Sequence, residues 1–287
     1  MLKRKIAIVG SDGQLSYDLI KIFSEDNLLV KLKHNDLDVT DIEACRRVFK
    51  KEKPQVVINT AAFHRTGDCE LNPKKSFLVN AIGAYNCAKA SKEVGAVIIF
   101  ISTDYVFDGT KKYFNENDLP NPLNVYGTSK LAGEALTKIG NPQHYIVRTS
   151  WLYGKKKSGK GHNFVYLMLE KAQKEEAVRV VNDQFGCPTY TSDLSFKIKQ
   201  LVDKKAPFGI YNIVNSGYCS WYKFAKEILR LSNKKVNLVG YSSKENPSPF
   251  ARPKYSILST KKIEKSKLGK LRPWDKALKS FLKELKR

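Results

Sequence analysis

The stretch Ile6-Ala-Ile-Val-Gly10-Ser-Asp-Gly13-Gln-Leu15 decides the fold of this chain. Its first four residues form an apolar run of strand length, the two glycines predict a tight turn, and an amphipathic helix is predicted from about Gln14 to Glu25. Glycines at such a place let a phosphate approach the backbone, and the free N–H groups of the helix start bind it. We interpret the stretch as a phosphate-binding turn; a turn that needs glycine only for its conformation is the simpler alternative.

Short apolar strands alternate with helical patterns through the first half of the chain. Strands are predicted near 28–32, 55–58, 96–101 and 144–148, and helices near 41–51, 69–94 and 123–138. Fully apolar strands separated by helices are typical of a parallel sheet that is covered on both faces. We therefore predict an α/β fold, a Rossmann-type doubly wound parallel sheet, with residues 1–150 as its dinucleotide-binding domain.

The pattern changes after Trp151. A short strand near 179–181 and a turn at Cys187-Pro188 lead to the apolar run 209–214, which is predicted to rejoin the main sheet. The last third is richer in loops and ends in a basic helix. We expect residues 151–287 to form mainly a smaller substrate-binding lobe, with about 188–214 returning to the first domain.

Composition limits the class of protein. The chain has 287 residues, of which 42% are hydrophobic, and its longest apolar run is strand-sized, too short for a membrane helix. The apolar part of the N-terminus is too short for a signal-peptide core, so we expect a cytoplasmic protein. The five cysteines are scattered without C-x-x-C pairing, which predicts reduced thiols and no metal site.

The formal net charge of +23 has two interpretations. It could attract nucleic acid or another polyanion, or it could reflect lysines spread over solvated faces. The lysines run through the whole chain without an aromatic-interleaved block, so the second interpretation is favoured. We predict neither nucleic-acid nor membrane binding, although the charge would help to attract an anionic nucleotide substrate.

The cofactor half of the predicted site extends beyond the glycine turn. In the turn itself the candidate contacts are Gly10, Asp12, Gly13, Gln14 and Leu15, and Ser16 stands where a third glycine would favour close packing. Lys33 follows the second strand, at the place where an acidic residue would bind the ribose of NAD. A cation there suits the 2′-phosphate, so NADP(H) is preferred and NAD(H) is the alternative. Asp38-Val39, at the end of a predicted next short strand, are placed to meet the adenine.

A catalytic pair is predicted on the helix near 123–138. Tyr126 and Lys130 are four residues apart and therefore share one helix face. A neighbouring ammonium is expected to lower the tyrosine pKa, which makes the pair a usable acid or base near neutrality. Thr103, at the carboxyl end of a buried strand, could hydrogen-bond the substrate oxygen beside Tyr126. By itself Tyr-x-x-x-Lys is common by chance, and only its order with the other segments makes it specific.

Several segments together carry a resemblance to a known family. They are Gly10 to Leu15, Asn59-Thr-Ala-Ala-Phe63, Val79-Asn-Ala81, Ser102-Thr-Asp-Tyr-Val-Phe-Asp-Gly109, Tyr126 to Glu134, Arg148-Thr-Ser-Trp151, Asn163-Phe-Val165, Asp183 to Thr189, and Arg252-Pro253. In this order, over nearly the whole chain, the sequence resembles the extended short-chain dehydrogenase/reductase superfamily and, within it, the dTDP-4-dehydrorhamnose reductase family.

The resemblance implies NAD(P)H-dependent reduction of the C4 keto group of a nucleotide-linked 6-deoxy-hexulose, from dTDP-4-dehydro-L-rhamnose to dTDP-L-rhamnose. It implies that Tyr126 protonates the alkoxide with the help of Thr103 and Lys130. The other implied roles fall into two groups. Ala61, Ala62 and Asn80 would lie at the cofactor, which Tyr126 and Lys130 would also contact. Asp104, Tyr105, Trp151, Asn163 and Arg252 would lie at the substrate, with Trp151 stacking on the base.

One departure bears on the sugar. Many members of the family carry Val-Asp where this chain has Thr66-Gly67, in a predicted loop near the substrate, and His64 replaces a smaller polar residue. A reductase of a different nucleotide sugar is therefore an open alternative. A second is a non-catalytic NADP-binding regulatory subunit that resembles that of methionine adenosyltransferase, although Tyr126 and Lys130 are both present. A homodimer also remains open.

Overall fold

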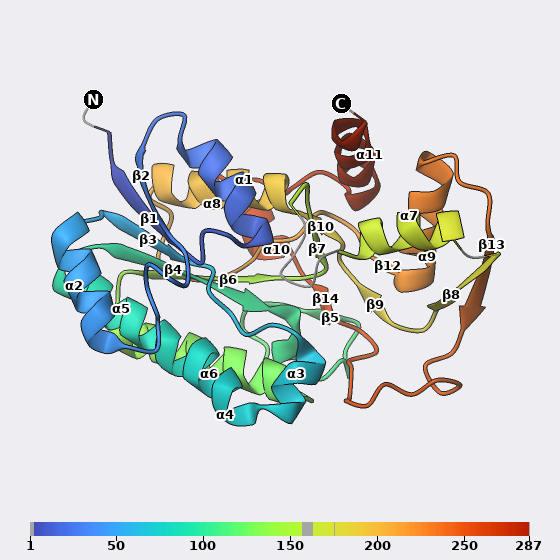
Figure 1. The fold of residues 1–287 in the computed structure, drawn as a ribbon, viewed down its shortest axis with the longest axis horizontal. Helices are drawn as coiled ribbons and strands as arrows, with labels where there is room; N and C mark the ends of the chain where they lie inside the picture. Colours follow the sequence, from blue (N-terminus) through green and yellow to red (C-terminus); the bar gives the residue numbers. More distant parts are fainter. Residues whose placement is uncertain (1–2, 157–162, 175, 287) are drawn as a thin grey trace.

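A six-stranded parallel sheet forms the centre of the molecule in the computed structural model, which describes residues 3–156, 163–174 and 176–286 (Figure 1). The strands run in the order β11-β6-β4-β3-β1-β2, and every neighbouring pair is parallel. Their bounds are β1 Lys5–Val9, β2 Leu28–Leu32, β3 Val56–Asn59, β4 Val97–Thr103, β6 His144–Thr149 and β11 Gly209–Asn212. The predicted α/β class with a doubly wound parallel sheet is confirmed.

Helices cover both faces of this sheet (Figure 1). On one face lie α1 Gln14–Phe23 and α8 Thr191–Asp203; on the other lie α2 Ile42–Glu52, α5 Gly83–Glu93 and α6 Val125–Gly140. Successive residues of a strand point to opposite faces, so Ile6 and Ile8 pack with α1 and α8, whereas Ala7 and Val9 pack with α2 and α5. This double cover is why the inner strands are largely apolar.

The order in which strands are added to the sheet switches sides at β1. β2 pairs with one side of β1, and the next strand, β3, pairs with the other side. In open α/β sheets a crevice forms at the carboxyl ends of the strands at such a switch, and ligands bind there. The glycine turn that follows β1 and the loop that follows β3 therefore meet at this edge.

The single long helix predicted over residues 69–94 is wrong. The structure has α3 Thr66–Leu71, α4 Pro73–Phe77, a π-helical turn over Leu78–Ile82, and then α5. Pro73 supplies no backbone N–H and starts a new helix at its first position. The loop expected at Thr66-Gly67 is instead the first turn of α3.

The short strand predicted to end at Asp38-Val39 is also absent from the described residues. Two aspartates there bind nearby backbone N–H groups: Asp36 accepts from Lys33 N at 2.9 Å, and Asp38 accepts from Thr40 N at 2.9 Å. Such local side-chain bonds compete with a strand ladder and favour turns. Val39 is nevertheless buried, against α2 and α5.

The remaining elements form a second, aromatic-rich core on the right of Figure 1. It is built from β7 Leu152–Tyr153, α7 Phe164–Lys174, β8 Ala177–Val181, β10 Thr189–Tyr190, β12 Cys219–Ser220, α9 Trp221–Leu231, β13 Asn237–Tyr241 and α11 Trp274–Leu285. The short strands β5 Tyr113–Phe114, β9 Phe185–Gly186 and β14 Ile257–Leu258 lie between the two cores. Helix α10 Lys261–Lys265 packs on the main core through Ile263. The predicted return of 209–214 is confirmed for Gly209–Asn212, which pairs with β6.

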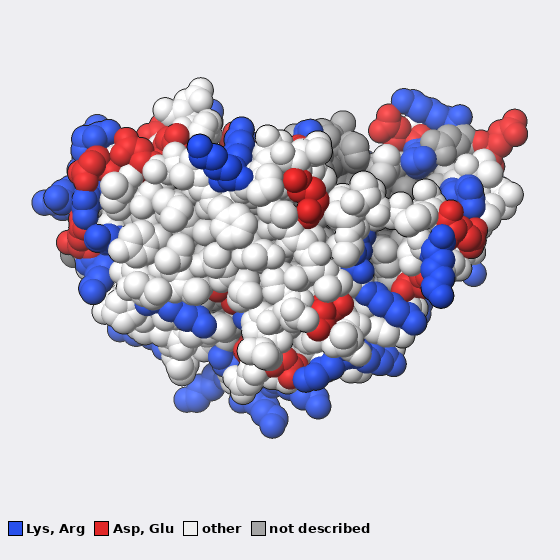
Figure 2. Space-filling view, turned by 90° about the horizontal axis from the view of Figure 1, so that it is seen from below, with Lys and Arg blue, Asp and Glu red and all other residues white. Residues whose placement is uncertain are grey.

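Charge is distributed unevenly over the surface. Figure 2 shows the face that lies at the bottom of Figure 1; its centre carries few charged side chains, whereas lysines and arginines stand along its edges. Among the described residues, no helix is both long enough and apolar enough to cross a bilayer.

Candidate active site

Gly10 shapes the turn at the end of β1. Its φ is +77°, a region that favours glycine, and a Cβ at this position would lie 2.9 Å from the backbone N of Ala61. Gly13 caps helix α1 in extended conformation without a side-chain capping bond. The first N–H groups of α1 therefore have no capping side chain, which suits an anion at the helix start.

Ser16 stands at the position of the third glycine, and its side chain is accommodated between helix α1 and the turn after β1. Its buried hydroxyl donates to Gly10 O at 2.8 Å and lies 2.7 Å from the Thr60 hydroxyl, which donates to Val9 O at 2.7 Å. These bonds tie the turn after β1 to the loop after β3. Ala61 and Ala62 follow in that loop and are partly exposed at the same edge.

Lys33 is the first residue after β2, as the sequence predicts, and its side chain is exposed. Asp38 is also exposed, and the backbone N–H and hydroxyl of Thr40 hold the pKa of its carboxyl below the usual value. Asp12 is exposed in the turn, Gln14 is partly buried, and Leu15 turns into the core. Leu15 can therefore offer a ligand only its backbone.

Asn80 connects the cofactor loop to the catalytic helix. Its side chain donates to Phe63 O at 2.8 Å and accepts from Phe63 N at 2.9 Å, which fixes the loop after β3. It also donates to the Ser129 hydroxyl at 3.0 Å, and Ser129 donates to Tyr126 O at 2.8 Å. Asn80 lies in the π-helical turn, a distortion that is frequent at functional sites.

Thr103, Asp104, Tyr105 and Tyr126 meet at the carboxyl end of β4. Thr103 is its last residue, and its hydroxyl donates to Asp104 Oδ1 at 3.0 Å. The ring of Tyr105 lies edge-on to that of Tyr126, with centroids 6.1 Å apart. Gly127 permits this approach, because a Cβ there would lie 2.1 Å from Tyr105 O. The sequence predicted this group, and the structure brings it together.

The predicted lowering of the Tyr126 pKa by Lys130 is not seen in this structure, and the role of the pair stays a prediction. Burial raises the pKa of Tyr126, and its hydrogen bond with Thr103 opposes that rise. Lys130 starts on the same face of α6, but its Nζ lies 4.0 Å from the centroid of the Phe100 ring. Burial lowers the pKa of Lys130 to about 7, against the attraction of Glu134. Its ammonium thus lies against the ring of Phe100 on β4, and its part in catalysis stays a prediction.

Asp104 is a further group at this edge of the sheet whose pKa is strongly shifted. It is 3% exposed, and burial raises its pKa to about 7, against hydrogen bonds from Ser256 and Thr103. A carboxyl with that pKa exchanges its proton at neutral pH. Asp104 is therefore a buried carboxyl with a pKa near neutrality in the same group as Tyr126.

A buried ion pair behind this group was missed by the sequence analysis. Arg148 donates to both carboxylate oxygens of Glu134, at 2.8 and 2.6 Å, and Ser102 donates to Glu134 at 2.6 Å. The pair joins α6 to the ends of β4 and β6. A signal was present, because an arginine inside an apolar strand requires a buried acidic partner.

Trp151 lies after β6 with φ +46°, and its ring is stacked on that of Trp221, with centroids 3.4 Å apart. Gly186 lies close to it as well, since a Cβ there would be 2.4 Å from the Trp151 ring. One face of the Trp151 ring is thus covered by Trp221, which the sequence analysis missed. Trp221 is the first residue of α9, and no spacing in the sequence connects it with Trp151.

Asn163 lies between the two cores. Its amide donates to Gln14 Oε1 at 3.2 Å, so it touches the cofactor turn, and it donates to Gly154 O at 3.0 Å. Its carbonyl oxygen accepts from Val165 N and Tyr166 N and thereby caps α7. Asn163 therefore has a structural role as the cap of α7, in addition to its predicted contact with the substrate.

Arg252 reaches the tyrosine group from a loop late in the sequence. A hydrogen bond from Arg252 is among the contacts of the Tyr105 hydroxyl, and its guanidinium lies 4.8 Å from the Phe250 ring centroid. A Cβ on Gly67 would lie 3.6 Å from Phe250. The departure at Thr66-Gly67 is thus adjacent to the loop that carries Arg252.

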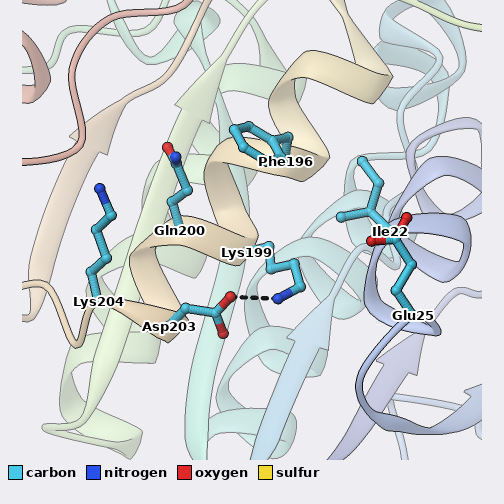
Figure 3. Close-up of a pocket in the computed structure, with 7 residues that line it drawn as sticks. All are labelled: Ile22, Glu25, Phe196, Lys199, Gln200, Asp203 and Lys204. Atoms are coloured by element: carbon cyan, nitrogen blue, oxygen red, sulfur yellow. Dashed lines mark hydrogen bonds and ion pairs between the residues drawn. The ribbon is translucent and has the colours of Figure 1, made fainter.

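Two surface hollows lie elsewhere and hold none of the predicted residues. One, of about 420 Å³, lies between α1 and α8, where Lys199 pairs with Asp203 beside Ile22 and Glu25 (Figure 3). The other, of about 910 Å³, is lined by residues of β5, β14 and α10 and by Tyr218, which precedes β12. Within the described residues no three His, Cys, Asp or Glu side chains gather as metal ligands, and all five cysteines are buried.

A tyrosine and a lysine on one helix, a threonine at the next strand end and a glycine turn across the sheet reversal are arranged as in extended short-chain dehydrogenase/reductase enzymes. By fold and site this chain is an oxidoreductase of that class.

Comparisons with known proteins identify the family. The model of the RmlD substrate binding domain matches residues 4–287. SpsK of Bacillus subtilis, a spore coat polysaccharide biosynthesis protein, is 38% identical over 98% of this chain and 97% of its own length. The dTDP-4-dehydrorhamnose reductase of Mycolicibacterium smegmatis is 35% identical over 97% of this chain and 85% of its own length.

A solved structure agrees with these relatives. The dTDP-4-dehydrorhamnose reductase of Bacillus anthracis, crystallised in complex with NADP, superposes with a TM-score of 0.94 at 37% identity, over 99% of this chain and all of that one. The chain belongs to the dTDP-4-dehydrorhamnose reductase family.

Proposed function

We propose that this protein reduces the C4 keto group of dTDP-4-dehydro-L-rhamnose to give dTDP-L-rhamnose, with NADPH as reductant. The observation that carries the proposal is the cluster of Thr103, Tyr126 and Tyr105 at the end of β4, on the same sheet edge as the glycine turn. The names of the relatives support the substrate, and the NADP complex of the Bacillus anthracis enzyme supports the cofactor.

The residues of the turn fit a dinucleotide. The space beside the backbone of Gly10 is one that a Cβ would fill. The hydroxyl of the next residue, Ser11, is buried and has no hydrogen-bond partner among the residues that the structure describes. Gly10, Gly13 and the start of α1 would hold the pyrophosphate, and exposed Lys33 would bind a 2′-phosphate. When bound, NADPH supplies a hydride to the carbonyl carbon.

The protein's own residues supply the proton and the orientation. Because burial raises its pKa, Tyr126 enters the reaction protonated and gives its hydroxyl proton to the forming alkoxide. Thr103 holds that hydroxyl in place through their hydrogen bond. The exposed guanidinium of Arg252, beside Tyr105, offers a partner for the substrate diphosphate, and the aromatic group of Trp151 and Trp221 offers a surface for the base.

The test follows NADPH absorbance in the presence of dTDP-4-dehydro-L-rhamnose. The protein is expected to oxidise NADPH, and Tyr126→Phe to lower kcat by about 100-fold or more, since general acid catalysis contributes on that order. Tyr17→Phe, on the exposed surface of α1, is the matched control and should keep the wild-type rate. A protein that binds NADPH but turns over no substrate would instead support the regulatory-subunit alternative.

A different nucleotide sugar is the second candidate substrate, and Gly67 is the observation that favours it. The position has no side chain, and the nearest group to a Cβ there is the Phe250 ring at 3.6 Å. The space between residues 66–67 and the loop that carries Arg252 is therefore larger than it would be with Val-Asp at these two positions. Comparing kcat/KM for 4-keto sugars that differ at C2, C3 or C5 tests this candidate, which fails if the dTDP-4-dehydro-L-rhamnose isomer is preferred.

We further propose that the chain acts in the cytoplasm, with 1–150 plus about 188–214 as the cofactor-binding unit and 151–287 as mainly the substrate-binding unit. A homodimer is proposed through the weakly charged face of Figure 2. Leu78 and Ile82, in the π-helical turn between α4 and α5, are both exposed, at 41% and 42%. Light scattering of Ile82→Lys against wild type is the test; a wild-type monomer at micromolar concentration would exclude this dimer.

A further inference from the structure

Arg252 stands on a segment without helix or strand, so its position depends on the residues that hold the backbone on either side of it. On its C-terminal side Gly109 allows a close approach, since a Cβ there would lie 2.8 Å from Lys254 N. On its N-terminal side the Asn124 side chain donates to Ala251 O at 3.0 Å. The residue before Arg252 is thus held by a side chain that lies 127 positions away in the sequence.

Asn124 uses both ends of its amide group. It is the N-cap of α6, where its Oδ1 accepts from Gly127 N at 2.8 Å, while its Nδ2 makes the bond to Ala251. The residue is only 6% exposed, so water has little access to this bond. Serine or aspartate caps a helix as well as asparagine does, but asparagine also carries an amide donor. The bond to the Arg252 segment therefore goes beyond what capping requires.

The same side chain connects two parts of the site. Tyr126 lies two residues after Asn124, in the first turn of α6, and Arg252 lies one residue after Ala251. The amide of Asn124 binds the backbone of both segments, one through its oxygen and the other through its nitrogen. The separation of the proton donor from the guanidinium is therefore determined in part by one side chain.

We propose that Asn124 is a positioning residue for the diphosphate of the nucleotide-sugar substrate, because it holds the backbone next to Arg252. The inference rests on the proposed function, in which Arg252 is the partner of that diphosphate. Without the bond, the segment that carries Arg252 is no longer tied to α6 and must be ordered when the ligand binds. Ordering a loop opposes binding, so the affinity for the nucleotide should fall. The proton transfer from Tyr126 in the bound complex should continue.

The test combines dTDP binding, measured by calorimetry, with steady-state kinetics of Asn124→Ser, which keeps a capping oxygen and removes the amide donor. The Kd for dTDP and the KM for the sugar nucleotide should each rise about fivefold, the scale of one neutral hydrogen bond, with kcat within about twofold of wild type. Asn141→Ser is the matched control. Asn141 is 1% exposed at the other end of α6, and its amide donates to Ala96 O at 2.9 Å. This variant should leave Kd, KM and kcat unchanged.

A double-mutant cycle decides whether Asn124 acts through Arg252. Arg252→Ala should weaken dTDP binding, and adding Asn124→Ser to it should weaken binding no further. The proposal is overturned if Asn124→Ser leaves the Kd unchanged or has the same effect with and without Arg252. A dTDP affinity that does not depend on Arg252 overturns it together with the proposed role of the arginine. Protein that shows the expected binding effects but reduces no substrate supports this inference and contradicts only the proposed reaction.

Discussion

Gly10 is needed for both its backbone angle and its lack of a side chain, and a matched pair of variants separates these two requirements. Gly95 has nearly the same φ, +73° against +77°, but open space where a Cβ would stand. Both alanine variants should lose about 1–2 kcal/mol of unfolding free energy to the strained backbone. Gly10→Ala should lose more, and it should also weaken NADPH binding. Urea unfolding and fluorescence titration are the measurements; equal losses of stability would show that the contact with Ala61 is not important.

Lys33 is the residue on which the choice of cofactor depends. A charge-assisted hydrogen bond contributes about 1.5–3 kcal/mol, so Lys33→Ala should raise the Kd for NADPH by roughly 10- to 100-fold and leave that for NADH nearly unchanged. Lys50→Ala, an exposed lysine of α2, is the control for net charge. Similar changes for both cofactors in Lys33→Ala would show that the lysine does not bind the 2′-phosphate.

Residues in one segment of sequence could be predicted well, and residues brought together by folding could not. Thr103 ends one strand and Asp104 and Tyr105 follow it, so their place at the sheet edge is determined by that strand's end. The direction of the Lys130 side chain depends on Phe100 and Glu134, which lie on other elements or turns. The stacking of Trp221 on Trp151 depends on how two distant segments pack, which no local pattern encodes.

At the scale of elements, the ion pair of Glu134 and Arg148 joins α6 to the sheet beneath the catalytic group. Both side chains are 2% exposed, and removing one partner of such a pair costs about 3–5 kcal/mol because the other charge stays buried. Glu134→Gln should therefore lose unfolding free energy on that scale. Glu227→Gln breaks the exposed pair with Arg230 and should lose less than about 1 kcal/mol. Equal losses in a denaturation series would contradict this difference.

The strands were predicted more accurately than the helices that join them. Buried parallel strands are continuous apolar runs, and β2 begins and ends at the predicted residues. Over 69–94 the apolar pattern continues through Pro73 and the π-helical turn, so periodicity alone hides two breaks. At 37–39 the burial of Leu37 and Val39 imitates the alternation of a strand, whereas the aspartates beside them bind the backbone in a turn.

For the molecule as a whole, two buried groups predict how stability changes with pH. Asp104 is protonated in the folded protein up to about pH 7 but only to about 3.8 when unfolded, so the free energy of unfolding should fall as pH rises between these values. Lys130 is protonated in the unfolded protein up to about pH 10.5 but only to about 7 when folded, so the free energy should rise between these values.

Urea unfolding of the apoprotein from pH 4 to 10 measures both effects. Asp104→Asn should remove the fall on the acidic side, and Lys130→Met should remove the rise on the alkaline side. Each variant should leave the other limb as in the wild type. A variant that shifts the whole curve without changing either slope would show that these groups do not titrate as described.

The contact between α1 and α8 has a consequence for synthesis on the ribosome. When residues 1–150 have been translated, five of the six strands of the main sheet exist, but Thr191–Asp203 does not. Leu19 and Phe23 pack in one cluster with Leu194 and Ile198, so until then they face water on the nascent chain. The growing polypeptide thus presents an apolar surface that only its later part can cover, so the risk of aggregation is greatest in this interval.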